Sequence, residues 1–214
     1  AIEARSGRRL AELEPGLYQS PEAASLMLAD LARAARAASA ASPVVATVFE
    51  PVSLLGEAGI SELQAQTVAV LNLDSLPTEV LGRRRAFDVH LGGDDDRARD
   101  ALLLDQVATL LDEPHAVTLQ RLETPLFHGV AVSAHAEVSA EAWRSALAAE
   151  PAIEIDEDSS LIGPVDCGED ERAKVTGLRD DGRGGCWCFA AADGLRRGPV
   201  GNALALLGAE PTDV

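Results

Sequence analysis

Residues 43–71, PVVATVFEPVSLLGEAGISELQAQTVAVL, contain the two patterns on which the fold prediction rests. The first ten residues form a nearly continuous apolar run, which is typical of a strand buried inside a sheet. Further along, apolar residues recur at helical spacing and predict a helix over 57–71. The predicted apolar positions of this helix are Ile60, Leu63, Thr67, Val70 and Leu71. A buried strand followed by a helix with one apolar face predicts a domain that contains both kinds of element.

Similar patterns recur along the rest of the chain. Helices are also predicted from Pro21 to about residue 40, over 97–112, and after Ser139, where Trp143 and Leu147 lie one turn apart. Further strands are predicted over residues 116–124, 129–138 and 185–193. Because the order of these elements is not a regular βαβ alternation, the predicted fold is α+β. It consists of a mixed, largely antiparallel sheet covered by helices.

The predicted first helix has an unusual beginning. Ser20 and Pro21 form a strong helix-start signal, with Ser as the N-cap and Pro as the first helical residue. Helix N-termini are common sites for phosphates, carboxylates and activated cysteines. The first turn here nevertheless contains Glu22, Ala23 and Ala24, none of which is an activated nucleophile. The more apolar face of this helix is expected to carry Leu26, Leu28 and Leu31.

The composition excludes several classes of partner. The 214 residues include 35 acidic and 18 basic side chains, so that the net charge is −17. A negative field of this size repels nucleic acid and anionic membranes, and neither is expected as a partner. No apolar run approaches the roughly 18 residues of a membrane span. The odd number of cysteines fits a reducing compartment, which predicts a cytoplasmic protein.

No catalytic or cofactor motif stands out in the sequence. A dinucleotide-binding G-x-G-x-x-G fingerprint and a P-loop are both absent, and the four histidines are scattered without metal-ligand spacing. Cys186 and Cys188 flank Trp187 and are expected to point to the same face of a strand. A single C-x-C pair is a weak metal signal, so these cysteines and Cys167 are expected to be buried thiols rather than metal ligands. A metal or small-ligand binder remains a minor alternative.

Three segments, in order, resemble the dimerisation domain of aspartate-semialdehyde dehydrogenases. Residues 44–67 are similar to the strand, loop and helix that open that domain. Residues 122–138 resemble a strand pair of the family, and residues 192–206 resemble its closing helix. The family positions matched in this last segment are Asp193, Arg196, Arg197, Gly198, Asn202 and Ala203.

The resemblance implies a domain organisation. It covers residues 17–208 and implies the C-terminal domain fold of semialdehyde and glyceraldehyde-3-phosphate dehydrogenases, with a last helix at about 195–208. Residues 1–16 are expected to be a linker remnant and residues 209–214 a tail. Because only about sixteen residues precede the first helix, the Rossmann-type nucleotide-binding domain of the family is expected to be missing.

The resemblance also locates the reactive positions of the family. The cysteine that attacks the aldehyde as a thiolate falls on Ala23, and the histidine that transfers protons falls on Val130. The glutamine that orients the substrate falls on Glu50, and the arginine that pairs with the substrate carboxylate falls on Glu123. No catalytic residue is therefore expected. A cleft lined by these two glutamates is expected to prefer cations or neutral molecules.

The remaining implications concern cofactor and partners. Asn202 matches a family asparagine near the nicotinamide of NADP and is interpreted as a vestigial cofactor-binding residue that now caps or packs the last helix. No bound cofactor is expected. The chain resembles Usg-type paralogues, which keep this architecture without the catalytic cysteine. The family pairs its subunits through this domain, so a homodimer is expected, and pairing with a true family enzyme is a second possibility.

Two functions follow from these expectations. The first is a non-catalytic dimerisation module that resembles aspartate-semialdehyde dehydrogenase. The alternative is the C-terminal part of an NADP-dependent oxidoreductase of amino-acid biosynthesis. In that case Ser20 or Ser25 would have to replace the missing thiol, although neither has a base beside it in the sequence.

Overall fold

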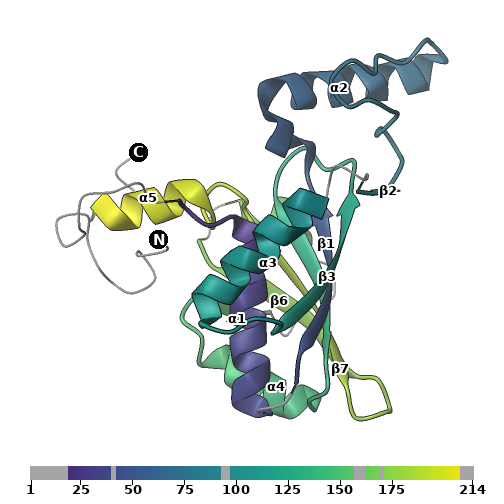
Figure 1. Cartoon of the computed structure of the whole chain (residues 1–214). Helices are drawn as coiled ribbons and strands as arrows, with labels where there is room; N and C mark the ends of the chain where they lie inside the picture. Colours follow the sequence, from purple (N-terminus) through teal and green to yellow (C-terminus); the bar gives the residue numbers. More distant parts are fainter. Residues whose placement is uncertain (1–18, 40–41, 93–96, 157–161, 169–170, 208–214) are drawn as a thin grey trace.

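The centre of the molecule is a seven-stranded mixed sheet (Figure 1). The computed structural model describes residues 19–39, 42–92, 97–156, 162–168 and 171–207, so the predicted linker remnant at 1–16 and tail at 209–214 lie outside the described residues. The strands are β1 (Val44–Glu50), β2 (His90–Leu91), β3 (Val117–Glu123), β4 (Val130–Ala136), β5 (Ile153–Ile155), β6 (Ala173–Asp180) and β7 (Cys186–Ala192).

The sheet is mixed, with mostly antiparallel neighbours. Its strand order is β2-β3-β1-β4-β7-β6-β5. The pairs β1/β3 and β5/β6 are parallel, and the other four neighbouring pairs are antiparallel. The predicted α+β class with a largely antiparallel sheet is therefore confirmed. Although β3 and β4 are consecutive in the chain, they are not neighbours, because β1 lies between them.

Three helices cover one face of the sheet. They are α1 (Ala23–Ala38), α3 (Arg97–Leu111) and α4 (Ala140–Ala148). Helix α1 lies between α3 and α4 and against the sheet (Figure 1), so that twelve of its sixteen residues are buried. Leu26, Leu28 and Leu31, which were predicted to lie on the more apolar face, are all buried. Burial extends to nearly all sides of α1, because its many alanines permit close packing.

Helix α1 begins two residues later than its start signal predicts. Its N-cap is Glu22, whose side chain makes no capping hydrogen bond. The predicted N-cap, Ser20, instead accepts a hydrogen bond from Asn202 Nδ2 at 2.6 Å and contacts the carbonyl of Pro199 at 3.4 Å. The serine hydroxyl is thus committed to a contact distant in sequence, and for this reason it does not cap the helix.

Helix α4 agrees with its sequence signals. The hydroxyl of Ser139 accepts a hydrogen bond from the backbone N–H of Ala142 at 3.2 Å and caps the helix. Trp143 and Leu147 are completely buried against α1 and the sheet. The short, well-capped helix with two apolar anchors one turn apart is therefore confirmed.

Helix α2 (Gly56–Asn72) stands apart from the other helices at one end of the sheet, after the short 3₁₀ helix η3 (Val52–Leu55) (Figure 1). It packs on η3 and on the loop that follows it, where Leu63 belongs to a separate small apolar cluster. The expected apolar face is only partly correct: Leu71 is 72% exposed, whereas the polar residues Glu62 and Gln66 are buried. These two side chains hold the following loop.

Strand β1 was predicted to be buried on both of its faces, but only the face toward the helices is buried. In β1, Val44, Ala46 and Val48 face the helices and are buried, whereas Val45 is 51% exposed on the opposite face. We call this opposite side of the sheet the far face. Among the described residues, a segment around the 3₁₀ helix η5 (Pro164–Cys167) packs over one end of the far face.

The last helix, α5 (Pro199–Leu207), is shorter than the predicted 195–208, since residues 194–198 form a turn and residue 208 lies outside the described part. It lies beside the N-terminal end of α1 (Figure 1). Arg197, just before α5, forms a buried ion pair with Asp30 in the middle of α1. No helix in the described part of the chain combines the length and apolar character needed to cross a membrane.

Candidate functional site

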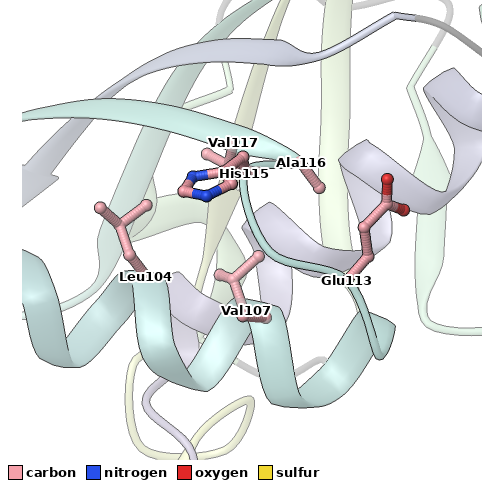
Figure 2. Close-up of a pocket in the computed structure, with 7 residues that line it drawn as sticks. Leu104, Val107, Glu113, His115, Ala116 and Val117 are labelled. Atoms are coloured by element: carbon pink, nitrogen blue, oxygen red, sulfur yellow. The ribbon is translucent and has the colours of Figure 1, made fainter.

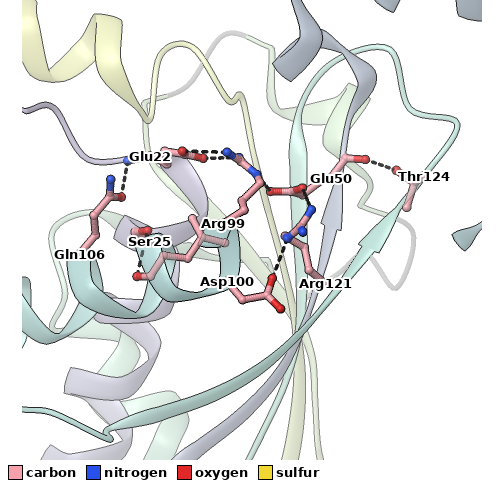
Figure 3. A network of polar contacts seen from close by, with 9 residues as sticks. Glu22, Ser25, Glu50, Arg99, Asp100, Gln106, Arg121 and Thr124 are labelled. Carbon is pink, nitrogen blue, oxygen red and sulfur yellow. Dashed lines mark hydrogen bonds and ion pairs between the residues drawn. The ribbon is translucent and has the colours of Figure 1, made fainter. Parts of the chain in front are cut away.

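The candidate site lies at the edge of the sheet where β1 and β3 both end. The two strands are parallel and place Glu50 beside Glu123, so that their carboxyl ends meet. The first turns of α1 and α3 reach the same edge, as Figure 3 shows. In open sheets, ligand sites commonly form outside the carboxyl ends of parallel strands.

Five charged side chains form a continuous series of ion pairs at this edge, which we call the charge chain (Figure 3). Arg99 contacts both carboxylate oxygens of Glu22, at 3.1 and 2.5 Å, and its Nε donates to Oε1 of Glu50 at 2.9 Å. Arg121 donates to the other Glu50 oxygen at 2.6 Å and to Asp100 at 2.8 Å. Both oxygens of Glu50 are therefore engaged by guanidinium groups from two different elements.

The environment of the charge chain favours the charged forms of its arginines. Burial lowers the pKa of Arg99, but the carboxylates of Glu50 and Glu22 outweigh this effect and leave the pKa raised. Glu50 and Arg121 are 5% and 4% exposed. Charges removed from water to this degree need close partners, and here each has one.

Glu123 is also paired with arginine, but its partners come from the loop that follows α2. Its carboxylate lies 2.6 Å from Nη2 of Arg85 and 3.9 Å from Nη2 of Arg83. The sequence predicted a cleft in which Glu50 and Glu123 repel anions. This expectation needs correction, because each of the two glutamates is neutralised by arginine and neither presents a free carboxylate.

The loop that carries Arg85 is held in place by α2. The carboxylate of Glu62 accepts hydrogen bonds from the backbone N–H groups of Val80 and Leu81 at 2.8 and 2.7 Å. The amide of Gln66 makes four further hydrogen bonds to the backbone of residues 77–86. Two buried side chains one turn apart on α2 thus fix the loop and bring Arg85 to Glu123.

The residue predicted to stand at the position of the family nucleophile is buried and has no reactive side chain. Ala23 is the first residue of α1 and is 6% exposed. Gly198 lies so close that a Cβ atom built on it would be 3.1 Å from the Ala23 backbone nitrogen. The N–H of Glu22, next to it, donates to Oε1 of Gln106 at 3.0 Å.

The two serines nearest this position are committed to structural contacts. Ser20 bonds Asn202, as described above, and the buried Ser25 hydroxyl donates to the carbonyl of Leu103 at 3.4 Å. Among the residues that the structure describes, no histidine or carboxylate contacts either hydroxyl to remove its proton. Asn202 is 8% exposed and joins α5 to the segment before α1.

Val130, which is predicted to stand at the position of the family histidine, is buried in the main core. His128, two residues earlier, is exposed. Between them, Gly129 has φ +79°, and a Cβ atom on it would lie 2.5 Å from Cβ of Pro164, so this backbone conformation and close approach require glycine. No proton-transfer group occupies this point of the structure.

The cysteines are buried free thiols, as the C-x-C spacing predicted. Cys186 and Cys188 both face the helices on β7, and burial raises the pKa of each thiol. Within the described residues, no three histidine, cysteine, aspartate or glutamate side chains are arranged to hold a metal ion.

Two hollows lie away from the charge chain, toward the C-terminal end of α3. One is a cavity of about 60 Å³ between α3 and β3, lined mainly by apolar side chains with His115 and Glu113 beside them (Figure 2). It is large enough for one or two water molecules and too small for a metabolite. The other is an open groove of about 300 Å³ whose arginines, Arg33 and Arg36, are already paired with acidic side chains.

The arginines of the candidate site were not predicted from the sequence. Arg121 lies two residues before Glu123, and strand alternation places both on one face, so this residue could have been found. Arg99 and Arg85 give no such local signal, because a helix and a loop distant in sequence bring them to the site.

Comparisons with known proteins agree with the resemblance seen in the sequence. The chain is 32% identical over 182 residues to a USG-1 protein homolog from Azotobacter vinelandii, and the match covers 75% of this chain and 52% of that protein. It thus spans about half the length of the curated relative it matches. No family model matches the sequence.

Two solved structures have a fold similar to that of this chain. Aspartate semialdehyde dehydrogenase II from Vibrio cholerae superposes with a TM-score of 0.78 at 24% identity, over 88% of this chain and 60% of that one. A probable aspartate-semialdehyde dehydrogenase from Pseudomonas aeruginosa superposes with a TM-score of 0.75 at 24% identity, over 97% of this chain and 65% of that one. The recognition made from the sequence is therefore confirmed: the chain has the fold of the C-terminal domain of aspartate-semialdehyde dehydrogenases and is similar in sequence to a USG-1 protein homolog.

Proposed function

We propose that this chain is a non-catalytic module of the aspartate-semialdehyde dehydrogenase fold, and that its role is to pair with a second copy of itself in the cytoplasm. The observation that carries the loss of catalysis is the charge chain, together with the side chains at the former reactive positions. Ala23 and Val130 offer neither a nucleophile nor a proton-transfer group.

The charge chain also argues against binding of the family substrate. A substrate carboxylate needs a guanidinium group with free donors. Arg99 and Arg121 instead bind Glu22, Glu50 and Asp100. The protein thus supplies, from its own side chains, the carboxylates that a substrate would bring, and an incoming anion would have to displace one of them.

The proposed pairing is supported by the uncovered far face of the sheet. Among the described residues, helices α1, α3 and α4 cover one face, whereas the far face is covered only at the end next to η5. A sheet face with exposed apolar residues is a common site of subunit contact. A second copy is the proposed partner, and a true family enzyme is the alternative. The three free thiols fit a reducing compartment.

Activity should be tested on the natural gene product that contains this chain, because the chain spans about half of its curated relative. The assay is phosphate-dependent reduction of NADP in the presence of aspartate semialdehyde, with a catalytic family enzyme as the positive control. We expect no turnover above the no-enzyme rate. Turnover by the unmodified protein would overturn the proposal in favour of the NADP-dependent oxidoreductase, and Ser20→Ala and Ser25→Ala variants would then identify its nucleophile.

Pairing is tested by the mass of this chain in solution, measured by light scattering after size exclusion over a concentration series. A dimer has twice the chain mass of 22.3 kDa. A monomer at every concentration would overturn the pairing and leave the question of catalysis to the enzyme assay.

A further inference from the structure

The outer edge of β3, on the side away from β1, is only partly covered. Strand β2 pairs with β3 at Leu122 and Glu123, and the N–H of Gly92 donates to the carbonyl of Arg121 at 3.3 Å (Figure 1). In the described part of the chain, no strand lies beside the outer edge of residues 117–120. An uncovered strand edge is a template to which a further strand can be added.

The strand register shows which backbone groups face this outer edge. The N–H of Val44 in β1 donates to the carbonyl of Ala116 at 3.0 Å. Because the backbone groups of successive strand residues point to opposite edges, the N–H and C=O groups of Val117 and Leu119 point away from β1. No residue within the described ranges hydrogen-bonds to these four groups. They are therefore available to an added strand.

The cavity of about 60 Å³ between α3 and β3 lies next to these groups, on the helix side of the sheet. Its lining includes Leu104 and Val107 of α3 and Val117 of β3, and Figure 2 shows the ring of His115 as one of its walls. A strand added beside Val117 would place one side chain on the same side of the sheet, toward this cavity. The space is sufficient for a small apolar side chain. Backbone pairing combined with a side-chain pocket is a common way to bind an extended peptide.

Two carboxylates lie along the flank of α3 that borders the cavity. Asp105 is next to the cavity residue Leu104, and Asp112 follows the last residue of α3. Both aspartates are exposed, and neither forms an ion pair with another described residue. Seven residues along a helix span about 10 Å. This is close to the roughly 13 Å between residues i and i+4 of a strand, whose side chains share one face.

We propose that the outer edge of β3 binds an extended basic segment of another protein by strand addition. A small apolar side chain of that segment occupies the cavity beside Val117, and lysine or arginine side chains two residues before and after it pair with Asp105 and Asp112. A second copy of this chain does not fit the edge, because two such edges side by side would bring like charges together. The surface is separate from the far face and from the charge chain.

The first experiment uses a capped synthetic peptide, Gly-Lys-Thr-Val-Thr-Lys-Gly, as the probe. Nuclear magnetic resonance follows the backbone amides of this chain during titration with the peptide. We expect a dissociation constant below about 1 mM, with the largest shifts at Val117 and Leu119. Two control peptides carry N-methylvaline at the central position, which removes one N–H donor, or glutamate in place of both lysines. Each is expected to bind at least about tenfold more weakly.

Variants of the protein test the cavity and the charges separately. Leu104→Lys, which places a charge at the cavity, is expected to weaken binding about tenfold, and Leu71→Lys on α2 is its matched control. Asp105→Lys changes only an exposed residue and is expected to weaken binding severalfold. Its control is Asp74→Lys, an equally exposed position after α2. Both controls are expected to bind within about twofold of the wild type.

The outcomes decide between strand addition and its alternatives. No shift at Val117 or Leu119 up to about 5 mM peptide overturns the proposal. Equal binding of the N-methylated peptide overturns strand addition, and equal binding of the glutamate peptide overturns the assignment of a basic partner. Shifts centred on Trp187 would move the site to the far face and would also overturn it. None of these results affects the proposed pairing or loss of catalysis, which light scattering and the enzyme assay measure independently.

Discussion

At the residue scale, Glu50 illustrates how one side chain organises the sheet edge that carries the candidate site. It ends a strand of apolar residues, yet its carboxylate joins Arg99 from α3 to Arg121 from β3. Because Glu50 and Arg121 are both buried, removal of the Glu50 charge leaves each arginine with one carboxylate, Glu22 for Arg99 and Asp100 for Arg121, in a medium that solvates charge poorly. We therefore expect the buried middle of the charge chain to contribute more to stability than its exposed end.

The first prediction is that Glu50→Gln destabilises the protein by about 3 kcal/mol, because it leaves two guanidinium groups around a neutral amide. The control is Asp100→Asn at the outer end of the charge chain, where the carboxylate is 38% exposed. That substitution is expected to cost about 1 kcal/mol or less, since water screens an exposed pair. Urea denaturation gives both values, and equal costs for the two variants would contradict the view that burial makes Glu50 critical.

At the element scale, α2 owes its position to polar side chains. Its apolar cluster is small, and Glu62 and Gln66 bind the backbone of the loop at residues 77–86. A buried polar side chain is expensive unless it is hydrogen-bonded, and the four hydrogen bonds of Gln66 satisfy this requirement. The loop in turn determines where Arg85 meets Glu123.

The second prediction concerns this loop. Gln66→Ala leaves several loop backbone groups without partners and is expected to cost about 2–3 kcal/mol in the local stability of residues 77–86. Hydrogen exchange should be faster at the N–H groups of Leu81, Arg85 and Ala86, and unchanged in α1. Gln64→Ala, on the exposed side of the same helix, is the control. Uniformly faster exchange throughout the molecule would show that the loop does not open independently.

The third prediction concerns pH and the turn between β6 and β7. Hydrogen bonds from the backbone of Arg183, from His135 and from the backbone of Gly185 lower the pKa of Asp181 to about 2. A depressed carboxyl pKa contributes stability that is present above the unfolded value of about 3.9 and is lost as the pH falls through 2. The difference in stability between wild type and Asp181→Asn should therefore shrink as the pH falls from 4 toward 2. A difference that does not change between pH 5 and 2 would contradict the assignment.

At the scale of the whole molecule, the distribution of charge matters more than its sum. On the far face, the paired positions of β3, β1, β4, β7 and β6 contain no aspartate or glutamate, whereas Glu154 of β5 lies beside Lys174 at one edge. The repulsion between two chains of net charge −17 is therefore expected to be weakest at the middle of the far face. Salt is expected to act on the proposed pairing mainly through this long-range repulsion.

The fourth prediction follows from this distribution. Raising the ionic strength from about 0.05 to about 0.5 M shortens the screening length and should tighten pairing severalfold, because the repulsion between two negative chains falls. Sedimentation at constant pH measures the effect. An interface held by ion pairs would respond in the opposite direction, so weaker pairing at high salt would contradict an interface at the middle of the far face.

Local sequence patterns were sufficient to predict most of the helices and strands. The helical spacing of Trp143 and Leu147 after Ser139 predicted α4, and the pattern of residues 129–138 predicted β4, because these signals depend only on neighbours in the sequence. The start of α1 was predicted two residues too early, because it depends on a contact between residues distant in sequence. The hydroxyl of Ser20 accepts a hydrogen bond from Asn202, which is 182 residues away. The exposed side of β1 was likewise hidden, since an apolar run does not indicate whether both faces are covered.

The sequence by itself determined the mixed α+β class, the approximate elements and the resemblance to aspartate-semialdehyde dehydrogenases, because each depends on the order and spacing of residue types along the chain. Only the tertiary structure decided that Glu50 binds Arg99 and Arg121, which lie 49 and 71 residues away. It also decided which sheet face stays open. Ion pairs and covered faces arise between elements distant in sequence, and their energies depend on burial, which a linear pattern does not specify.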